Sequence, residues 1–477
     1  MNNGQGDAGL RMCMIRRNLF SRASGIVDED GTELLTCSII RERDLDFATD
    51  AEVVGSARRL AALHGTIPPG EFQLREMAAG FTHKTHSILN DQSLSGIVRP
   101  VTIHMHDWTR GFLVNGVFNT VVFLLFAAAV NASFKDIWSH VERYIHDWIW
   151  PGLTSVSKAL AECFSAKRGK SSRKAKSFKA SASDGLALYP VLALFVSNVL
   201  MRDGANSPCR LECLAFLALC DVLDMLTAVP LNIVTPEMLR GAVDAFLSAC
   251  IAAEWEDYTH SKFHWSIHLA AELARHSALY TCFVQERKHK VAKRYGNEIL
   301  NTVAFERSVL GEVHSHHLAE LRSGKVLHFG ECMLRDPKRA KPPLVALLKK
   351  ALGEDLVDAA ADDVLWSNVA QLLPAGVCCR RDIVLIKSMA PNAGSNALVA
   401  GEVWLHASVS GQCITLVNLL RPLTGPGEHR WSAAEERLEM VATEDVLTTC
   451  CHTAVHAGRP VRVIVPWHLK GWAVADR

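Results

Sequence analysis

The sequence predicts an α/β (α+β) protein with a long helical central part and a small β-rich C-terminal domain. Residues 184–256 are apolar and rich in Leu and Ala, which favours buried helices. Past Val377, short apolar runs alternate with turn residues, which is typical of strands. A chain of 477 residues can bury a large core and suggests about three domains.

The N-terminal hundred residues form a mixed segment. The pattern predicts a helix over 53–64, a break at Pro68-Pro69 and a second helix over 71–81. Residues 101–108 alternate like a short strand that ends in Asp107, and a long apolar helix is expected from Trp108 to about Val130. Asp107 is therefore either a functional acid at a strand end or the cap of the following helix.

A dense cationic segment surrounds one carboxylate further along the chain. Between Arg287 and Arg294 there are five Lys or Arg, one His and no acid, directly after Glu286. At helical spacing Glu286 shares a face with Lys290 and Lys293. This pattern is compatible with a divalent cation held beside a phosphate or with an ordinary solvated helix face. The candidate nucleic-acid-binding residues are Lys262, Arg287, Lys288, Lys290, Lys293 and Arg294.

Two further polar patterns have alternative interpretations. His104-Met105-His106-Asp107 mimics the His-x-His ligands of metal-dependent hydrolases, although the strand–helix repeats of that fold are not recognisable. Residues 167–179 carry seven cations and no acid, which predicts a solvated loop, a nuclear-import signal or a nucleic-acid contact. The histidines of 314–317 are expected on a helical surface, since adjacent residues do not share a helix face.

The C-terminal part changes character after Lys325. Residues 336–343 form a linker, and 344–373 are expected to form two short helices. Strands are predicted at 382–386, 398–405, 413–417 and 461–465. The predicted divisions are 1–100, 101–325 with a helical insertion at about 130–256, 326–376 as linker and short helices, and 377–477 as a β-rich accessory domain.

Composition limits the function classes. The formal net charge of +1 gives no global attraction to DNA, so that any binding must use local patches. The fourteen Cys show no paired C-x-x-C framework, which favours free thiols in a reducing compartment. The N-terminus lacks the pattern of a signal peptide. Residues 111–130 are about long enough to span a bilayer, but their asparagines favour a buried helix, and no membrane partner is expected.

Several segments, in order, resemble one family. Residues 99–119 resemble the second-aspartate region of CACTA-type DNA transposases, in particular the divergent group abundant in dinoflagellates. Residues 178–192 are similar to a further block, and 262–268 with 286–295 resemble the block around the catalytic glutamate. Residues 49–53 and 401–409 are also similar.

The resemblance implies an RNase H-like core in which two Asp and one Glu hold Mg²⁺ or Mn²⁺, with a helical insertion before the Glu. Asp107 matches the second Asp and Glu286 the Glu, so both are expected to be catalytic metal ligands lying close together. Arg110 stands where a metal-compatible His is expected, and Arg16 replaces the second Cys of a knuckle that begins at Cys13. A strand carrying the first Asp is not recognisable, and Asp7 is not counted in its place.

The sequence therefore predicts a truncated, degenerate transposase-derived protein. It is expected to be impaired in DNA strand transfer and to retain weakly specific, salt-dependent DNA binding. The alternatives are a metal-dependent hydrolase using His104, His106 and Asp107, and a non-enzymatic DNA-binding or scaffold protein. The expected localisation is nuclear, from the basic run 167–179, or otherwise cytoplasmic. DNA is the expected partner, and a homo-oligomer is a further expectation.

Overall fold

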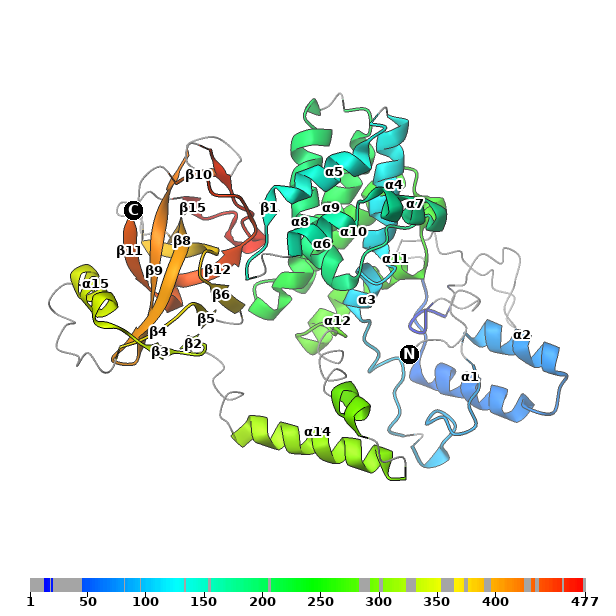
Figure 1. Ribbon diagram of the computed structural model, residues 1–477. Helices are drawn as coiled ribbons and strands as arrows, with labels where there is room; N and C mark the ends of the chain where they lie inside the picture. The colour runs from blue at the N-terminus through cyan, green and yellow to red at the C-terminus, as the bar shows by residue number, and fades with distance from the viewer. Residues whose placement is uncertain are drawn as a thin grey trace. The chain divides into compact units, whose positions relative to one another are not determined.

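The computed structural model confirms a mixed helical and β architecture. It describes residues 13–17, 19, 45–80, 82–94, 96–132, 134–152, 156–204, 207–282, 292–299, 303–322, 332–352, 364–372, 376–389, 396–423, 430–433, 437–456 and 459–474. The chain divides into two compact units, and the helices α7 (Ala166–Ala175) and α8 (Ala182–Phe195) contribute residues to both (Figure 1).

The first unit is helical. It holds α1 (Asp50–Leu63), α2 (Pro69–Ala79), η3 (Gln92–Leu94), α3 (Trp108–Phe112), α4 (Val117–Asn131), the π-helix η4 (Val196–Leu200), α9 (Arg210–Ala228), η6 (Val229–Leu231), α10 (Pro236–Ala252), η7 (Glu256–Tyr258), α11 (Ser261–Trp265), η8 (Ser266–His268) and α12 (Leu269–His276). In its core α9 packs against both α4 and α10, and α10 packs against α12. The prediction of buried helices over 184–256 is confirmed.

Local sequence signals explain where several of these helices begin and end. Thr49 and Glu52 form a reciprocal capping box at the start of α1, so two backbone N–H groups at that end have partners. Thr235 caps α10, whose first residue is Pro236. At the end of α2, Gly80 takes the left-handed conformation (φ +78°) that stops the helix.

The predicted helix from Trp108 to Val130 is interrupted. Its two pieces, α3 and α4, are separated by residues 113–116, where Asn115 has a left-handed backbone (φ +46°). A Cβ on Gly116 would lie 2.3 Å from the Gly111 carbonyl oxygen, so only glycine fits this close approach. Asn119 then accepts a hydrogen bond from the Gly116 N–H (3.0 Å) and starts the second piece.

Within the described residues, three helical stretches are long and apolar enough to cross a membrane by length and composition. They are Trp108–Asn131, Ala182–Leu200 and Arg210–Leu231, whose apolar windows are 61%, 44% and 50% buried inside the protein. The buried share includes the contact of α4 with α9, in which Phe118 and Phe216 meet. Much of this apolar character therefore serves packing within the first unit.

The strand predicted over residues 101–108 is wrong. Residues 101–103 form a turn, and 104–107 are extended without a strand partner. The Asp50 carboxylate accepts hydrogen bonds from the Val101 and Thr102 N–H groups (2.7 and 3.0 Å), and Arg275 donates to the Thr102 carbonyl (2.8 Å). Because side chains satisfy these backbone groups, the segment needs no neighbouring strand.

The second unit combines helices with the β-rich part of the chain. It holds α5 (Ile137–His146), β1 (Trp148–Ile149), α6 (Val156–Glu162), a helix over 292–298, α14 (Phe305–Arg322), β2 (Met333–Leu334), β3 (Lys338–Arg339), α15 (Pro342–Leu352), β4 (Leu365–Ser367), β5 (Val369–Leu372), β6 (Gly376–Cys379), β7 (Ile383–Met389), β8 (Asn396–Val409), β9 (Gln412–Pro422), β10 (Arg430–Ser432), β11 (Leu438–Ala442), η11 (Thr443–Asp445), β12 (Val446–Cys450), β13 (His452–Thr453), β14 (Val461–Arg462), η12 (Trp467–Leu469) and β15 (Ala473–Val474).

The main sheet of this unit curls into a barrel. Its strand order is β12-β7-β8-β9-β10-β14. The chain after β12 enters β13, where His452 bridges Val463 just past β14, so the strand order returns to its start. One side of the alternating strands, including Leu385, Leu398 and Trp431, fills the interior. The other side, including Val384 and Val417, forms a second apolar layer with residues of β5, β6 and β11.

The longest strands, β8 and β9, form a hairpin with a two-residue turn. Val409 pairs with Gln412, and the turn residues Ser410 and Gly411 both have positive φ (51° and 84°). This is the backbone of the turn that matches the right-handed twist of paired strands. The strands predicted at 382–386, 398–405 and 413–417 are confirmed, and β14 occupies the start of the run predicted at 461–465.

Three further expectations differ from the structure. The second helix predicted within 344–373 is wrong, because 365–372 form β4 and β5 with the alternating burial of strands. The basic run predicted as a loop is mostly helical, since α7 covers 166–175. Between 101 and 325, the described residues contain a single strand, β1, which pairs with β13 rather than with a core sheet.

Candidate metal centre

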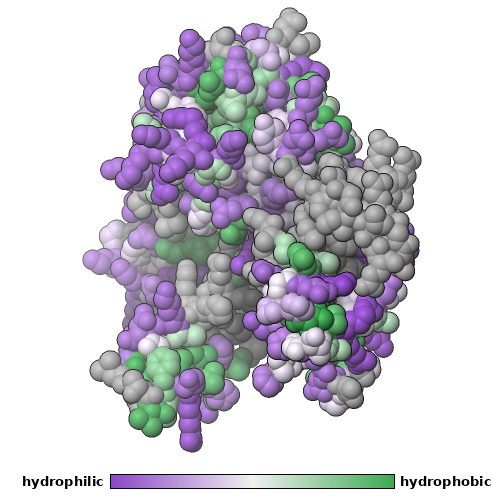
Figure 2. Space-filling model, turned by 90° about the vertical axis from the view of Figure 1, so that its right-hand side faces the viewer, coloured by the Kyte–Doolittle hydropathy of each residue, from purple (hydrophilic) through white to green (hydrophobic). Residues whose placement is uncertain are grey.

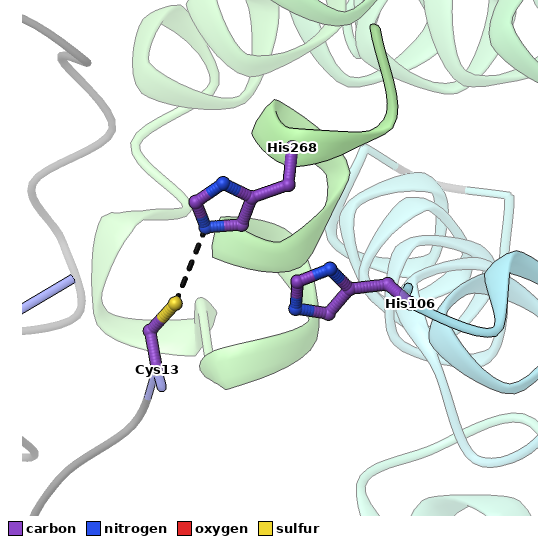
Figure 3. A group of neighbouring side chains, drawn as sticks. All are labelled: Cys13, His106 and His268. Atoms are coloured by element: carbon purple, nitrogen blue, oxygen red, sulfur yellow. Dashed lines mark hydrogen bonds between the residues drawn. The ribbon is translucent and has the colours of Figure 1, made fainter. Parts of the chain in front are cut away.

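Three segments that are distant in the sequence meet in the core of the helical unit. Cys13 comes from the N-terminal segment, His106 precedes α3, and His268 lies at the end of η8 (Figure 3). One ligand atom from each residue lies within 4.8 Å of those of the other two, and the side chains are 2%, 6% and 4% exposed. Sulfur and imidazole nitrogen are the donors that zinc prefers.

A further buried histidine lies beside this cluster. His264 is one helical turn before His268, and their Nε2 atoms are 3.1 Å apart. The Sγ of Cys13 is 3.2 Å from the same His268 Nε2. In a tetrahedral zinc centre, neighbouring donor atoms lie about 3.3 to 3.6 Å apart. Cys13, His106 and His268 therefore have the composition of a metal site, and the buried His264 lies beside His268 next to them.

The local fold holds His106 in one orientation. The Glu272 carboxylate on α12 accepts a hydrogen bond from the His106 backbone N–H (3.0 Å) and lies 2.5 Å from its ring Nδ1. With a proton on Nδ1, the Nε2 atom of His106 is left as the ligand atom. Glu272 is itself 3% exposed, and a buried carboxylate behind a ligating histidine is the usual outer partner of a metal site.

Further contacts anchor the loop that carries His106. Asp50, at the start of α1, accepts from the Thr102 hydroxyl (2.5 Å) as well as from the two backbone groups described above. Burial raises the pKa of Asp50, but the hydrogen bonds from Thr102 and Val101 lower it by more. The net shift of this pKa is therefore downward. An ionised Asp50 therefore holds the loop that leads to His106.

The electrostatics of the cluster favour a thiolate. Burial alone raises the pKa of Cys13, but the electrostatic interaction with His268 and the hydrogen bonds from the three histidines bring it well below its ordinary value. Burial lowers the pKa of His106, yet Cys13 and Glu272 raise it to about 9. Burial lowers the pKa of His268 to about 4. The negative charge of a buried Cys13 thiolate needs a positive charge close to it. A cation bound between the thiolate and the imidazoles would provide that charge.

The arrangement suits a structural cation better than a catalytic one. Cys13, His106 and His268 are all buried, and so is the neighbouring His264, so solvent has little access to the cluster. Thiolate and imidazole do not suit Mg²⁺, which takes oxygen ligands. The Nε2 atom of His268 lies next to both the Cys13 Sγ and the His264 Nε2. A proton on this nitrogen can be donated to only one of these two atoms, whereas one cation can be coordinated by all three.

Asp107 caps α3, as the second of its two interpretations predicted. Its Oδ1 accepts from the Thr109 N–H (3.1 Å), the Thr109 hydroxyl (2.5 Å) and the Arg110 N–H (3.2 Å). Although it follows His106, Asp107 is not among the three residues of the cluster at 4.8 Å. Its proposed partner Glu286 lies outside the described residues, so their proximity stays a prediction.

The segment just before Glu286 does lie beside Asp107. The Trp108 N–H donates to the Tyr280 carbonyl (3.3 Å), and the Thr109 hydroxyl is 3.2 Å from the Cys282 sulfur. The four residues from Cys282 to Glu286 can span no more than about 14 Å. The contact between 107–109 and 280–282 is therefore compatible with the predicted pairing of Asp107 and Glu286.

The predicted cationic surface is described only in part. Lys262 donates its Nζ to the carbonyls of Val114 (2.7 Å) and Asn115 (3.2 Å), so its charge lies against the chain itself. Lys293 and Arg294 are exposed on the helix over 292–298, and Arg294 lies 3.9 Å from Glu298. Arg287, Lys288 and Lys290 lie outside the described residues.

The hydrolase alternative predicted a different ligand set. The ring of His104 packs edge-on against that of His106, with centroids 4.5 Å apart, and burial lowers the pKa of His104 to about 3. In the part of the chain that the structure describes, the metal-compatible group joins His106 to Cys13 and His268, and neither His104 nor Asp107 belongs to it. The geometry gives no support to His104-x-His106-Asp107 as a metal-binding unit.

Sequence reasoning missed most of the metal centre. Cys13 was noted only as half of a degenerate knuckle, and His264, His268 and Glu272 were not singled out as ligands or partners. Two histidines at i and i+4 within a helical stretch were the available signal, because this spacing puts both rings on one face. The chain matches no family model, no curated protein and no solved structure.

Proposed function

We propose that this chain is a transposase-derived DNA-binding protein, impaired in strand transfer, whose N-terminal segment is fastened by a structural zinc ion. The observation that carries the proposal is the convergence of separate parts of the CACTA transposase resemblance. Cys13 from the degenerate knuckle, His106 from the second-aspartate region and His264 with His268 from the glutamate block meet in one buried cluster.

The contact between these segments is not a consequence of proximity in the sequence. Cys13 and His268 are 255 residues apart in the sequence, yet Sγ and Nε2 are 3.2 Å apart. Arg16, in the position of the second knuckle Cys, is buried and donates to the Leu45 carbonyl (2.9 Å). The proposed fourth ligand is instead a histidine, so the ion would be held by Cys13, His106, His264 and His268.

A zinc ion held here by four side chains would supply cross-linking energy and no reaction step, because no coordination position would be left for water or substrate. The chain's own residues do the rest: Glu272 orients His106, and the helical turn from His264 to His268 sets the spacing of two rings. An RNase H-like core with Asp107 and Glu286 as Mg²⁺ ligands is part of the proposal.

The expected loss of strand transfer follows from an incomplete set of catalytic carboxylates. Phosphodiester cleavage requires metal charge held at the reacting phosphate, and only two of three expected carboxylates are recognisable. One of them, Asp107, is also engaged by three hydrogen-bond donors at the helix end. Binding to DNA does not need these acids, so it can outlast catalysis.

The test combines metal analysis with DNA assays on the purified full-length chain. We expect one zinc per chain by elemental analysis, lost in Cys13→Ser and in His268→Asn and kept in Cys379→Ser, whose thiol lies in the β-rich unit. We also expect salt-dependent binding of duplex DNA without Mg²⁺-dependent nicking. If the purified protein has native stability and contains no zinc, the proposed metal centre is ruled out. Robust nicking that Glu286→Gln abolishes would show that the enzyme is intact.

A further inference from the structure

We infer that the exposed face of α7 binds the phosphate backbone of double-stranded DNA. The inference rests on the proposed DNA binding and assigns it to other residues than the cations near Glu286. Residues 166–179 contain seven cations and no acid. Most of this run forms the helix α7, which has one buried side. The helix therefore fixes the positions of the charged residues relative to one another.

The helix separates its small residues from its cations. Gly169 and Ser172 are buried and lie on one side of α7. At 100° per residue, Lys167, Lys170 and Lys174 fall within about 60° of one another on the opposite side. These three lysines, which we call the lysine stripe, are all exposed, and Arg168 and Arg173 flank them.

The end of α7 is tied to the core. The Phe178 N–H donates to the Asn119 carbonyl (2.8 Å), and the Asn119 amide donates back to the Phe178 carbonyl (2.8 Å). The Ser172 hydroxyl accepts from the Lys179 N–H (3.2 Å). Phe178 is itself fully buried, in contact with Phe118. A cationic surface that is ordered before binding loses less conformational entropy than a mobile basic tail.

The chemistry of the helix selects among anionic partners. A helix that lies in a membrane surface needs bulky apolar residues opposite its cations. The side of α7 opposite the lysine stripe carries Gly169 and Ser172 instead, and it is already buried in the protein. Figure 2, which looks from the side where Figure 1 draws α7, shows hydrophilic residues gathered over the upper half of that face. Such a surface fits a regular array of phosphates, and duplex DNA presents one charge per about 1.7 Å of axis.

The experiment measures binding of a fluorescent duplex of arbitrary sequence from 50 to 300 mM NaCl. The test variant is Lys167→Gln/Lys170→Gln/Lys174→Gln, since Gln keeps helix propensity and removes charge. Its matched control is Lys341→Gln/Lys349→Gln/Lys350→Gln, which makes the same charge change at exposed lysines of the β-rich unit. We expect the test variant to bind about tenfold or more weakly at 100 mM salt, with a salt slope flatter by two to three, roughly 0.9 per lost phosphate contact.

Each outcome separates this inference from the proposed function. If the parent binds DNA and the test variant matches it in affinity and slope, the lysine stripe is a solvated face, while the proposed DNA binding stands. If the parent does not bind DNA at 50 mM salt, the proposed function fails and the inference fails with it. Binding of the parent to phosphatidylserine vesicles but not to duplex DNA would assign the stripe to membranes and overturn the inference. Restored binding in the triple Lys→Arg variant would support a charge effect.

Discussion

Two sets of buried histidines in this protein differ in what satisfies their ring nitrogens. In the β-rich unit, His406 accepts a hydrogen bond from the Thr415 hydroxyl (2.9 Å) and donates to the Cys378 carbonyl (3.2 Å). In the helical unit, the nitrogens of His264 and His268 face each other and the Cys13 sulfur. Both ring nitrogens of His406 therefore have hydrogen-bond partners within the protein. The facing nitrogens of His264 and His268 need a shared proton or a cation.

The difference follows from how each unit brings its residues together. His406 and Thr415 are directly opposite each other in the β8–β9 pairing, so one hairpin supplies both partners. The candidate metal centre instead collects side chains from three segments with no common sheet or helix. Buried polar groups must find partners in either case, but local pairing satisfies them one by one, and long-range convergence leaves several donors around one point.

The largest effect that separates the two sites is expected from metal removal. Stripping zinc with a strong chelator should release the segment around Cys13 and the loop at 99–106, because structural zinc contributes about 10 to 16 kcal/mol in small zinc domains at pH 7. Hydrogen exchange should rise in those segments and stay unchanged across β7, β8 and β9. Equal loss of protection in both units, or no loss in either, would contradict the comparison.

The next effect is the pH dependence of the β-rich unit. Burial lowers the pKa of His406 from 6.5 to about 4. Between those values the unfolded chain binds a proton that the folded chain does not, so stability should fall as pH drops from 6.5 towards 4. The loss assignable to His406 is at most about 3 kcal/mol. Denaturant unfolding followed on the β-rich unit at several pH values measures it.

His406→Gln is the matched control for that titration. The amide can accept from Thr415 and donate to the Cys378 carbonyl without titrating, so the pH dependence in this window should weaken in the variant. A variant with the same pH slope as the parent would assign the slope to other groups, such as His452, whose pKa burial also lowers.

A smaller effect is expected from the carboxylate behind the metal centre. Glu272→Gln keeps the shape of the side chain but removes the charge that holds His106 Nδ1–H. Loss of such an outer partner typically weakens metal affinity 10- to 100-fold. Zinc affinity by competition with a chromophoric chelator should show this, and Glu256→Gln, at an exposed position, should leave affinity unchanged. Unchanged affinity in Glu272→Gln would mean that backbone contacts alone orient the ring.

The sequence predicts what short-range patterns determine. The capping box that starts α1 consists of residues next to that helix. The alternation of apolar and polar residues that predicts β8 and β9 lies within those strands. The strand predicted at 101–108 failed because its backbone partners are Asp50 and Arg275, respectively 51 and 173 residues away from the backbone groups they bind. The ligand set could not be assembled for the same reason, since nothing near Cys13 points to His268.

The smallest effect tests whether the helical site extends one residue beyond His106. Asp107 caps α3 through its Oδ1, and replacing a cap by Ala typically costs about 1 kcal/mol. Asn caps a helix about as well as Asp, so Asp107→Asn should be nearly neutral for the unfolding free energy, whereas Asp107→Ala should not. Zinc content should be the same in both variants, because Asp107 lies outside the Cys13, His106 and His268 cluster. A loss of Mg²⁺ or Mn²⁺ binding in Asp107→Asn, at unchanged stability and zinc content, would assign this carboxylate a second role as a ligand beside its capping role. Equal destabilisation by Asn and Ala would instead show that the negative charge, and not the hydrogen bonds to Thr109 and Arg110, is what the start of α3 requires.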